Sequence, residues 1–326
     1  VYDVDVEARK FIYRCEVEVD NSSYLKSSQN GKILYSIADE GVVAFRVLPN
    51  GSLARLNSAK IKGMRGCHLS TSKADDYIFI SGFHDGKITV LHLNEDGSVG
   101  DIADGVFHKG LGSVAERSFR PHVSCSRLTP DERFLMVADL GIDQIKVYRF
   151  DHKDGKIALV DTIRCELESA PKYFMFSSDG RFFYVLYEMK NVIEVYSYKE
   201  GERVPIVEKI QTISSTGSKP NQLTAACAMH FSPDEKHVFC SNAGDNTVSM
   251  YDRDDETGML TLRFCLPISG DYPKDIAIFP GGEHLASINH EGSISFFKID
   301  YEKGLLVMSD RSIKVNEPNC CEIVKI

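Results

Sequence analysis

A strand–turn–strand phrase recurs along this chain at intervals of about fifty residues. Each copy contains a polar turn, an apolar run, a second turn rich in Gly, Asp or Asn, and a run in which apolar and polar residues alternate. Alternation with a period of two is typical of half-buried β-strands. The six copies begin at Ser28, Ser72, Thr129, Ser177, Ser232 and Phe279. A repeat of this length that is built from short strands predicts a β-propeller, whose blades are arranged around one axis.

Two further apolar stretches complete each repeat. One lies just before the polar turn, as in KYFMFS at residues 172–177, and the other follows a turn such as HKDGK at residues 152–156. The Gly and Asp residues of these turns supply the positive φ angles that tight hairpins need. The sequence therefore predicts an all-β fold with four antiparallel strands in each blade.

The two ends of the chain lie outside the six repeats. Residues 1–19 and 304–326 both alternate as strands do. We predict that strands from both termini form a seventh blade, which closes the ring non-covalently and removes exposed strand edges. A ring of six blades is the alternative. Because the blades of a propeller share one core, residues 1–326 are predicted to form a single β-propeller domain.

The charge balance bears on the possible partners. The chain has 38 Lys and Arg residues against 47 Asp and Glu residues, a formal net charge of -9. No basic cluster offsets this charge, as a protein that binds a phosphate backbone would require. No apolar run approaches the roughly 18–20 residues that span a bilayer. We therefore expect neither nucleic acid nor a membrane as a partner.

The cysteines bear on the cellular compartment and on metal binding. There are nine of them, an odd number, and several lie within apolar strand runs, where a free Cys behaves as a small hydrophobic residue. No CxxC motif with a matching partner is present, so we expect no zinc site, no other metal and no cofactor. These observations predict reduced cysteines and a cytoplasmic protein.

Blade geometry converts spacing into location. The innermost strand of a blade runs along the axis and the next strand returns antiparallel to it. The residue that opens the first strand and the residue that closes the second should therefore lie at the same rim. These positions carry the following polar side chains: Tyr24, Asp39, Glu40, His68, His84, Asp85, His122, Asp139, Lys172, Glu188, His230, Asn242, Lys274, Asp275, Asn289 and His290. A polar, concave centre of this kind predicts a ligand site.

Several of these residues have a purely structural interpretation as well. His68 can hydrogen-bond within its strand, and Asp139 and Asn242 can hold turns through their side chains. Glu188 is different, because it follows the apolar run at residues 182–187 and faces Lys172 across the blade. This arrangement predicts a partly buried carboxylate beside a cation, which is a common feature of functional sites.

At these phrases the sequence resembles the seven-bladed lactonase family, which includes 6-phosphogluconolactonases and the fungal carboxymuconate-cyclising enzymes. The segment HKGLGSVAERSFRPH at residues 108–122 is similar to the family's His-x-Gly-x-Gly…Glu-Arg…Pro-His loop. Further similar segments are GCHLS at residues 66–70, APKYFMFSSDGRFFYVLYE at residues 170–188 and YPKDIAIFP at residues 272–280. The resemblance covers nearly the whole chain and implies a lactonase fold and activity.

The resemblance also implies where the catalytic residues of the family would fall. The second His of the family's Pro-His-x-His segment corresponds to Ser124, so that only His122 remains of the pair. The Arg of Gly-Pro-Arg-His corresponds to Lys172, and the acid of Asn-Glu corresponds to Glu188. A second Arg, in Ser-Asn-Arg-Gly, corresponds to Ala243. In the last repeat the Arg of Pro-Arg-Asp becomes Lys274, which is followed by Asp275. Lysine keeps the charge of arginine but not its bidentate geometry.

The first hypothesis is a lactonase with an altered site, acting on a small-molecule lactone or sugar acid. Lys172 would polarise the lactone carbonyl, and Glu188 or a nearby His would deprotonate the attacking water. His122 is the first candidate for that imidazole, with His68 and His230 as alternatives. The ligand-binding residues would be His68, Arg117, Ser124, His230, Lys274, Asp275 and His290.

Other functions stay open. The second hypothesis is a propeller that binds a sugar acid or another small anion without catalysis, because the family His and one Arg are replaced while lysines persist. The third is a platform for protein partners, which would require a large apolar surface patch. Within the first class, a reaction that cyclises or isomerises a diacid would need cations for two or three carboxylates.

Overall fold

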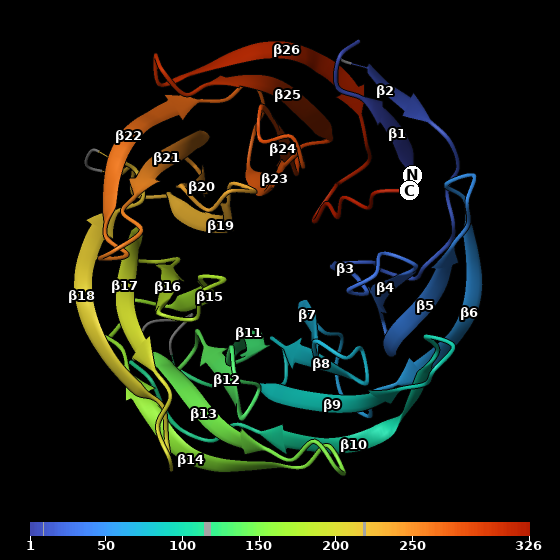
Figure 1. Ribbon diagram of the computed structural model, residues 1–326, viewed down its shortest axis with the longest axis vertical. Helices are drawn as coiled ribbons and strands as arrows, with labels where there is room; N and C mark the ends of the chain where they lie inside the picture. The colour runs from blue at the N-terminus through green and yellow to red at the C-terminus, as the bar shows by residue number, and fades with distance from the viewer. Residues whose placement is uncertain (9, 114–118, 218–219) are drawn as a thin grey trace.

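The computed structural model describes residues 1–8, 10–113, 119–217 and 220–326, and its strands form a ring (Figure 1). Six four-stranded sheets surround a common centre, and in each sheet the strands follow one another in chain order from the inside of the ring to the outside. These described segments contain no helix. The predicted β-propeller with four antiparallel strands per blade is therefore confirmed for the six repeats.

Residues 25–164 form the first three sheets. They consist of β3 (Leu25–Ser27), β4 (Ile33–Ala38), β5 (Gly41–Val47) and β6 (Leu53–Lys60), of β7 (His68–Thr71), β8 (Tyr77–Gly82), β9 (Lys87–Leu93) and β10 (Val99–Phe107), and of β11 (Val123–Leu128), β12 (Phe134–Asp139), β13 (Gln144–Phe150) and β14 (Ile157–Arg164).

The other three sheets continue the same order through residues 171–314. They consist of β15 (Pro171–Phe176), β16 (Phe182–Tyr187), β17 (Val192–Lys199) and β18 (Ile206–Ser214), of β19 (Ala225–Phe231), β20 (His237–Ala243), β21 (Thr247–Arg253) and β22 (Leu260–Pro267), and of β23 (Pro273–Ile278), β24 (His284–Asn289), β25 (Ser293–Asp300) and β26 (Leu305–Lys314).

The recurring polar turn joins the first and second strands of a sheet. In the fourth sheet the hydroxyl of Ser177 donates to Oδ1 of Asp179 at 2.6 Å, and the same oxygen accepts the backbone N–H of Arg181 at 3.0 Å. The hydroxyl–carboxylate bond recurs in the pairs Thr129–Asp131 and Ser232–Asp234. A Ser or Thr followed two residues later by Asp therefore closes the turn locally, which explains the repeated phrase without a chemical function.

The apolar side chains fill the layers between neighbouring sheets. Phe134 and Phe174 belong to one cluster that joins the third and fourth sheets, and Tyr184 and Val238 belong to another that joins the fourth and fifth. All four side chains are fully buried. Because each cluster draws on two sheets, no repeat buries its apolar faces alone.

The two ends of the chain lie between the sixth sheet and the first (Figure 1). Strands β1 (Tyr2–Asp5) and β2 (Lys10–Tyr13) pair as an antiparallel hairpin. The ring of Phe11 on this hairpin lies 5.3 Å from that of Phe296 and 6.3 Å from that of Phe279. The hairpin thus packs against the core of the sixth sheet.

A seventh four-stranded blade does not appear in the described residues. Much of the C-terminal segment that we expected to contribute to it forms β26, which pairs with β25 as the outer strand of the sixth sheet. Residues 315–326, called the tail below, contain no strand. Glu317 has a positive φ of 39°, and Pro318, which follows it, has no backbone N–H to donate. The seventh position therefore holds a two-stranded hairpin and an irregular tail.

Candidate functional site

The innermost strands β3, β7, β11, β15, β19 and β23 surround the centre of the ring (Figure 1). Aromatic rings near these strands contact one another from blade to blade. The ring of His68 lies 4.8 Å from that of Tyr24 and 5.8 Å from that of Tyr173. Tyr173 in turn lies 6.1 Å from His230. Side chains from four different sheets therefore meet here.

Four of the inner strands carry a β-bulge at this place. The pairing of β11, β15, β19 and β23 with their neighbours shifts by one residue near the start of each strand. The extra residues are Ser124, Lys172, Cys227 and Lys274. A bulge re-aims a side chain away from the regular alternation of a strand. Three of these side chains, Lys172, Cys227 and Lys274, interact electrostatically.

Lys172 and Glu188 form the ion pair that the sequence predicts. Glu188 directly follows β16, and the ladder between β15 and β16 sets it beside Lys172. The Nζ atom of Lys172 lies 2.7 Å from Oε2 of Glu188. Burial disfavours the ammonium group, but Cys227 and Glu188 more than compensate and hold the pKa of Lys172 above its usual range. Lys172 is therefore a persistent cation at the site.

Lys274 is the second cation that the bulges place here. Burial, together with the nearby charge of Lys172, lowers the pKa of Lys274. Its Nζ atom donates to Oδ1 of Asn319 in the tail at 2.6 Å. The tail thus supplies an uncharged oxygen to Lys274. This contact does not neutralise the positive charge of the lysine.

His230 and Asp275 join two neighbouring blades. Nε2 of His230, on β19, lies 2.9 Å from Oδ1 of Asp275, on β23. Oδ1 also accepts the N–H of Ile276 at 2.9 Å, and Oδ2 accepts the N–H of Cys321 in the tail at 2.9 Å. Two backbone amides therefore hold the carboxylate that faces His230.

His68 is not placed as a cationic ligand. Its ring is buried, with Nε2 3.6 Å from Sγ of Cys125, and Nδ1 accepts the N–H of Ser126 at 3.5 Å. Burial first, and then the positive charge of Arg127, lower the pKa of His68 well below its ordinary value. The imidazole is therefore neutral and engaged at both nitrogens.

His122 and Ser124 are held in place by backbone groups. The ring of His122 stacks on Phe83 at 4.3 Å, and Nδ1 lies 2.7 Å from the carbonyl oxygen of Phe83. Ser124, at the place of the family His, donates its hydroxyl to the carbonyl of Pro171 at 2.9 Å. Asp139 accepts the N–H of His122 at 2.8 Å and that of Gly141 at 3.1 Å, and the second bond confirms the turn-holding role considered from the sequence.

Two other residues, His290 and Arg117, were predicted to bind the ligand. His290 has its ring 6.0 Å from that of Tyr272, and its Nδ1 is buried without a partner in the described part of the chain. Arg117 lies outside the described residues, so its prediction stays a prediction.

Arg127 is the residue that the sequence analysis missed. It lies on β11, and its Nη2 donates to the hydroxyl of Tyr173 while Cζ lies 5.0 Å from the centroid of the Tyr173 ring. Its Nε is buried and has no partner among the described residues. The phenol of Tyr173 and the thiol of Cys125 outweigh burial and raise the pKa of Arg127. A half-buried cation with a buried, unpaired donor atom is suited to binding an anion.

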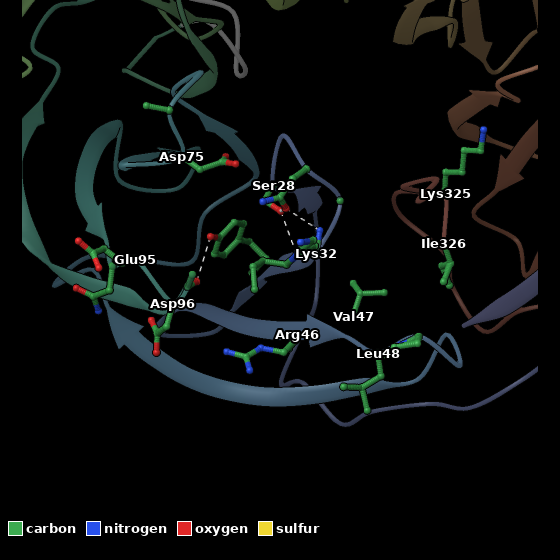
Figure 2. A pocket seen from close by; sticks show the side chains of 18 residues that line it. Ser28, Lys32, Arg46, Val47, Leu48, Asp75, Glu95, Asp96, Lys325 and Ile326 are labelled. Atoms are coloured by element: carbon green, nitrogen blue, oxygen red, sulfur yellow. Dashed lines mark hydrogen bonds between the residues drawn. The ribbon is translucent and has the colours of Figure 1, made fainter.

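A hollow lies at the opposite rim, where the turns of the first two sheets meet the end of the tail (Figure 2). It has a volume of about 760 Å³, and its lining includes Lys32, Arg46, Asp75, Asp96, Lys325 and Ile326. None of the residues that meet at the centre lines it. We regard the centre as the candidate site because the half-buried cations and the His–Asp pair lie there, whereas the hollow is lined by residues of loops and strand ends with mixed charges.

In residues 1–8, 10–113, 119–217 and 220–326, no group of three or more His, Cys, Asp or Glu side chains is arranged to hold a metal ion. Within the same segments, no helix has the length and apolar character needed to cross a membrane.

Comparison with known proteins identifies the family. A sequence model described as "Lactonase, 7-bladed beta-propeller" matches residues 1–323. The chain belongs to this family. Among the relatives of this lactonase-family protein, a 6-phosphogluconolactonase from Bacillus subtilis (strain 168) is 26% identical over 99% of this chain and 93% of its own length. One from Formosa agariphila is 26% identical over 97% of this chain and 92% of its own length.

Solved structures agree with this assignment. A candidate 6-phosphogluconolactonase from Bacteroides fragilis superposes with a TM-score of 0.88 at 29% identity, over 98% of this chain and 91% of its own. A periplasmic gluconolactonase from Pseudomonas aeruginosa superposes with a TM-score of 0.92 over 99% of this chain and 94% of its own. At 22% identity the latter similarity concerns the fold alone.

Proposed function

We propose that this lactonase-family protein hydrolyses a sugar or sugar-acid lactone at the centre of the ring, at the rim where Lys172 and Glu188 meet. The observation that carries the proposal is their 2.7 Å ion pair at the positions that resemble the family's Arg and acid. Relatives named 6-phosphogluconolactonase support the substrate class. The site departs from the family pattern at Ser124 and Ala243.

The chemistry requires a cation at the carbonyl and a base for the water. Lys172 donates to the carbonyl oxygen of the lactone and stabilises the negative charge that develops there. Water attacks the carbonyl carbon, a basic side chain accepts its proton, and the ring oxygen leaves as a hydroxyl group after taking a proton back. Glu188 orients the ammonium of Lys172. The base is Glu188 itself or a nearby imidazole, for which the sequence leaves His122, His68 and His230 open.

The positive charges favour a substrate that carries an anionic group. The whole chain has a formal net charge of -9, yet the cations Arg127, Lys172 and Lys274 lie on the inner strands β11, β15 and β23. Partly buried cations of this kind favour the binding of anions. A phosphate or carboxylate on the lactone would pair with Arg127 while Lys172 contacts the reacting carbonyl.

We also propose that the termini close the ring as an incomplete seventh blade. Support comes from Glu322 in the tail, whose Oε1 lies 3.0 Å from Nζ of Lys26 and accepts the N–H of Ser27 at 2.9 Å. On the other side, Cys321 bonds to Asp275 of the sixth sheet. The tail thus bridges the last and first inner strands.

The experiment is turnover of 6-phosphogluconolactone and simple aldonolactones, with spontaneous hydrolysis subtracted. Wild type is compared with Glu188→Gln and with Glu166→Gln, whose carboxylate forms an ion pair of the same length with Lys190 on the surface. We expect hydrolysis that falls by about 10²-fold or more in Glu188→Gln and is unchanged in Glu166→Gln. Full activity in Glu188→Gln would refute the role of Glu188.

The second candidate function is binding of a sugar acid without catalysis. It is favoured by Ser124 and Ala243, which stand where the resemblance places a His and an Arg. In that case, wild type shows saturable binding of 6-phosphogluconate in calorimetry and no hydrolysis above background. Turnover by the wild type would exclude this candidate.

A further inference from the structure

We infer that His230 is the base of this site, with Asp275 as its positioning residue and the tail as part of the arrangement. The inference rests on the lactonase function proposed above and selects one imidazole from the three that the sequence leaves open. The juxtaposition that carries it is His230, on β19, within 2.9 Å of Asp275, on β23, with Cys321 of the tail bonded to the same carboxylate.

The hydrogen bonds define which nitrogen of His230 accepts a proton. A carboxylate only accepts hydrogen bonds, so Nε2 of His230 carries a proton and donates it to Asp275 at 2.9 Å. Nδ1 then holds the free lone pair. The N–H groups of Ile276 and Cys321 fix both oxygens of Asp275 and prevent the carboxylate from rotating away from the ring.

Exposure and location separate His230 from the other imidazoles. Its side chain is 34% exposed, whereas His108, which faces Asp139 at 2.6 Å, is 0% exposed and inaccessible to substrate. His68 is neutral with both nitrogens engaged, and His122 faces a carbonyl through Nδ1 rather than a carboxylate. Within the described segments, His230 thus combines a carboxylate partner, partial exposure and a central position.

The dyad performs the proton transfer that lactone opening requires. The oxygen of water forms a bond to the carbonyl carbon as Nδ1 of His230 takes the proton, and the carboxylate of Asp275 stabilises the imidazolium. The bond between the carbonyl carbon and the ring oxygen then breaks, and the ring oxygen receives the proton from Nδ1. No oxidant, reductant or further reactant takes part, and His230 returns to its neutral form.

The surroundings of the dyad suit an anionic substrate. The ring of Tyr173 lies 6.1 Å from that of His230, and Arg127 packs on the same Tyr173 ring with Cζ at 5.0 Å. The guanidinium of Arg127 is therefore one aromatic ring away from the base. An anionic group held by Arg127 would place the lactone ring beside His230 and Lys172.

The tail makes the site dependent on the closure of the ring. Asn319 bonds to Lys274, Cys321 bonds to Asp275, and Glu322 bonds to Lys26 and Ser27 of the first sheet. Two tail residues, Asn319 and Cys321, thus hold a cation and the orienting carboxylate of the site, and Glu322 fastens the tail to the first sheet. The tail therefore contributes to catalysis by positioning as well as to stability.

The test compares wild type with His230→Gln and Asp275→Asn in lactone hydrolysis, with His237→Gln as the matched control. Nδ1 of His237, on β20, lies 3.1 Å from Oδ1 of Asp252, on β21. The ring of His237 stacks on that of Tyr301, away from the centre. We expect kcat to fall by about 10²–10⁴-fold in His230→Gln with KM little changed, and to remain at the wild-type value in His237→Gln. Added imidazole should restore part of the activity of His230→Gln.

Asp275→Asn should lower kcat about 10-fold or more with little change in KM, because the amide presents a donor to Nε2 and favours the wrong tautomer of the imidazole. Wild-type turnover that persists in His230→Gln would overturn the inference and leave the lactonase function standing. Absence of turnover in the wild type would overturn both. Thermal unfolding of each variant separates a loss of kcat from a loss of folding. If His230→Gln is unstable and added imidazole restores none of its activity, the result counts against the inference.

Discussion

The guanidinium of Arg127 packs on the ring of Tyr173, with Cζ 5.0 Å from the ring centroid, at the centre of a protein whose formal net charge is -9. Its Nε is buried and has no partner in the described residues. Withdrawing a charge from water without a counter-ion is unfavourable, so the position of Arg127 fits the anionic substrate proposed above.

This contact predicts a charge-selective effect of Arg127→Met. We expect KM for 6-phosphogluconolactone to rise about 10–100-fold, since a hydrogen bond to a charged group contributes about 1.5–3 kcal/mol. Hydrolysis of an uncharged aldonolactone should change much less. Steady-state kinetics on both substrates provides the measurement.

Arg149→Met is the matched control for Arg127→Met. Arg149 also packs on an aromatic ring, with Cζ 5.3 Å from the centroid of Phe134, but lies on β13 away from the centre. The Arg149→Met variant should leave the KM values for the charged and the uncharged lactone unchanged. Equal losses on charged and uncharged lactones in Arg127→Met would show that Arg127 acts only through the structure.

Glu322 links the tail to the first sheet, so Glu322→Gln tests how the ring is closed. The carboxylate lies 3.0 Å from Lys26 Nζ and accepts the N–H and the hydroxyl of Ser27, and its side chain is only 21% exposed. We expect the free energy of unfolding to fall by about 1–3 kcal/mol, because charge-assisted hydrogen bonds are replaced by neutral ones.

Urea denaturation measures the decrease in the free energy of unfolding of Glu322→Gln. Hydrogen exchange should show faster opening of the tail in this variant. Glu302→Gln is the control, since Glu302 is exposed in the turn between β25 and β26. If Glu322→Gln were as stable as Glu302→Gln, the tail would not contribute to holding the ring closed.

His68 predicts how stability changes with pH. Burial lowers its pKa well below the ordinary value, so below about pH 6.5 the unfolded chain binds a proton that the folded protein does not bind. This residue therefore makes the free energy of unfolding decrease as the pH falls, by up to about 1.4 kcal/mol per pH unit. The loss begins at the unfolded pKa and continues down to the folded pKa.

His68→Phe keeps an aromatic ring between Tyr24 and Tyr173 and removes the titrating group. Urea denaturation between pH 7.5 and pH 5.0 should show a shallower decrease in the variant than in the wild type. His92→Phe, on β9 in the second sheet, serves as a control with the same change of side chain. Parallel pH profiles of His68→Phe and the wild type would contradict the burial of a neutral imidazole.

The repeated phrase alone determined most of the fold. Its period and its two turns specify four strands per blade, because alternation with a period of two and the Ser–x–Asp turn are local properties. The same reasoning located the Lys172–Glu188 pair, since both residues stand at the ends of adjacent strands whose pairing follows from the hairpin. The family resemblance followed from the same local phrases.

Tertiary structure decided which way the central side chains point and how the ring ends. The bulges at Ser124 and Lys172 shift the register by one residue, and such a shift reverses the faces that a period of two predicts. The direction of Arg127 toward Tyr173 was therefore not readable from spacing. The pairing of His230 with Asp275, and the contacts of the tail with both end sheets, join residues distant in sequence, which only the closing of the ring brings together.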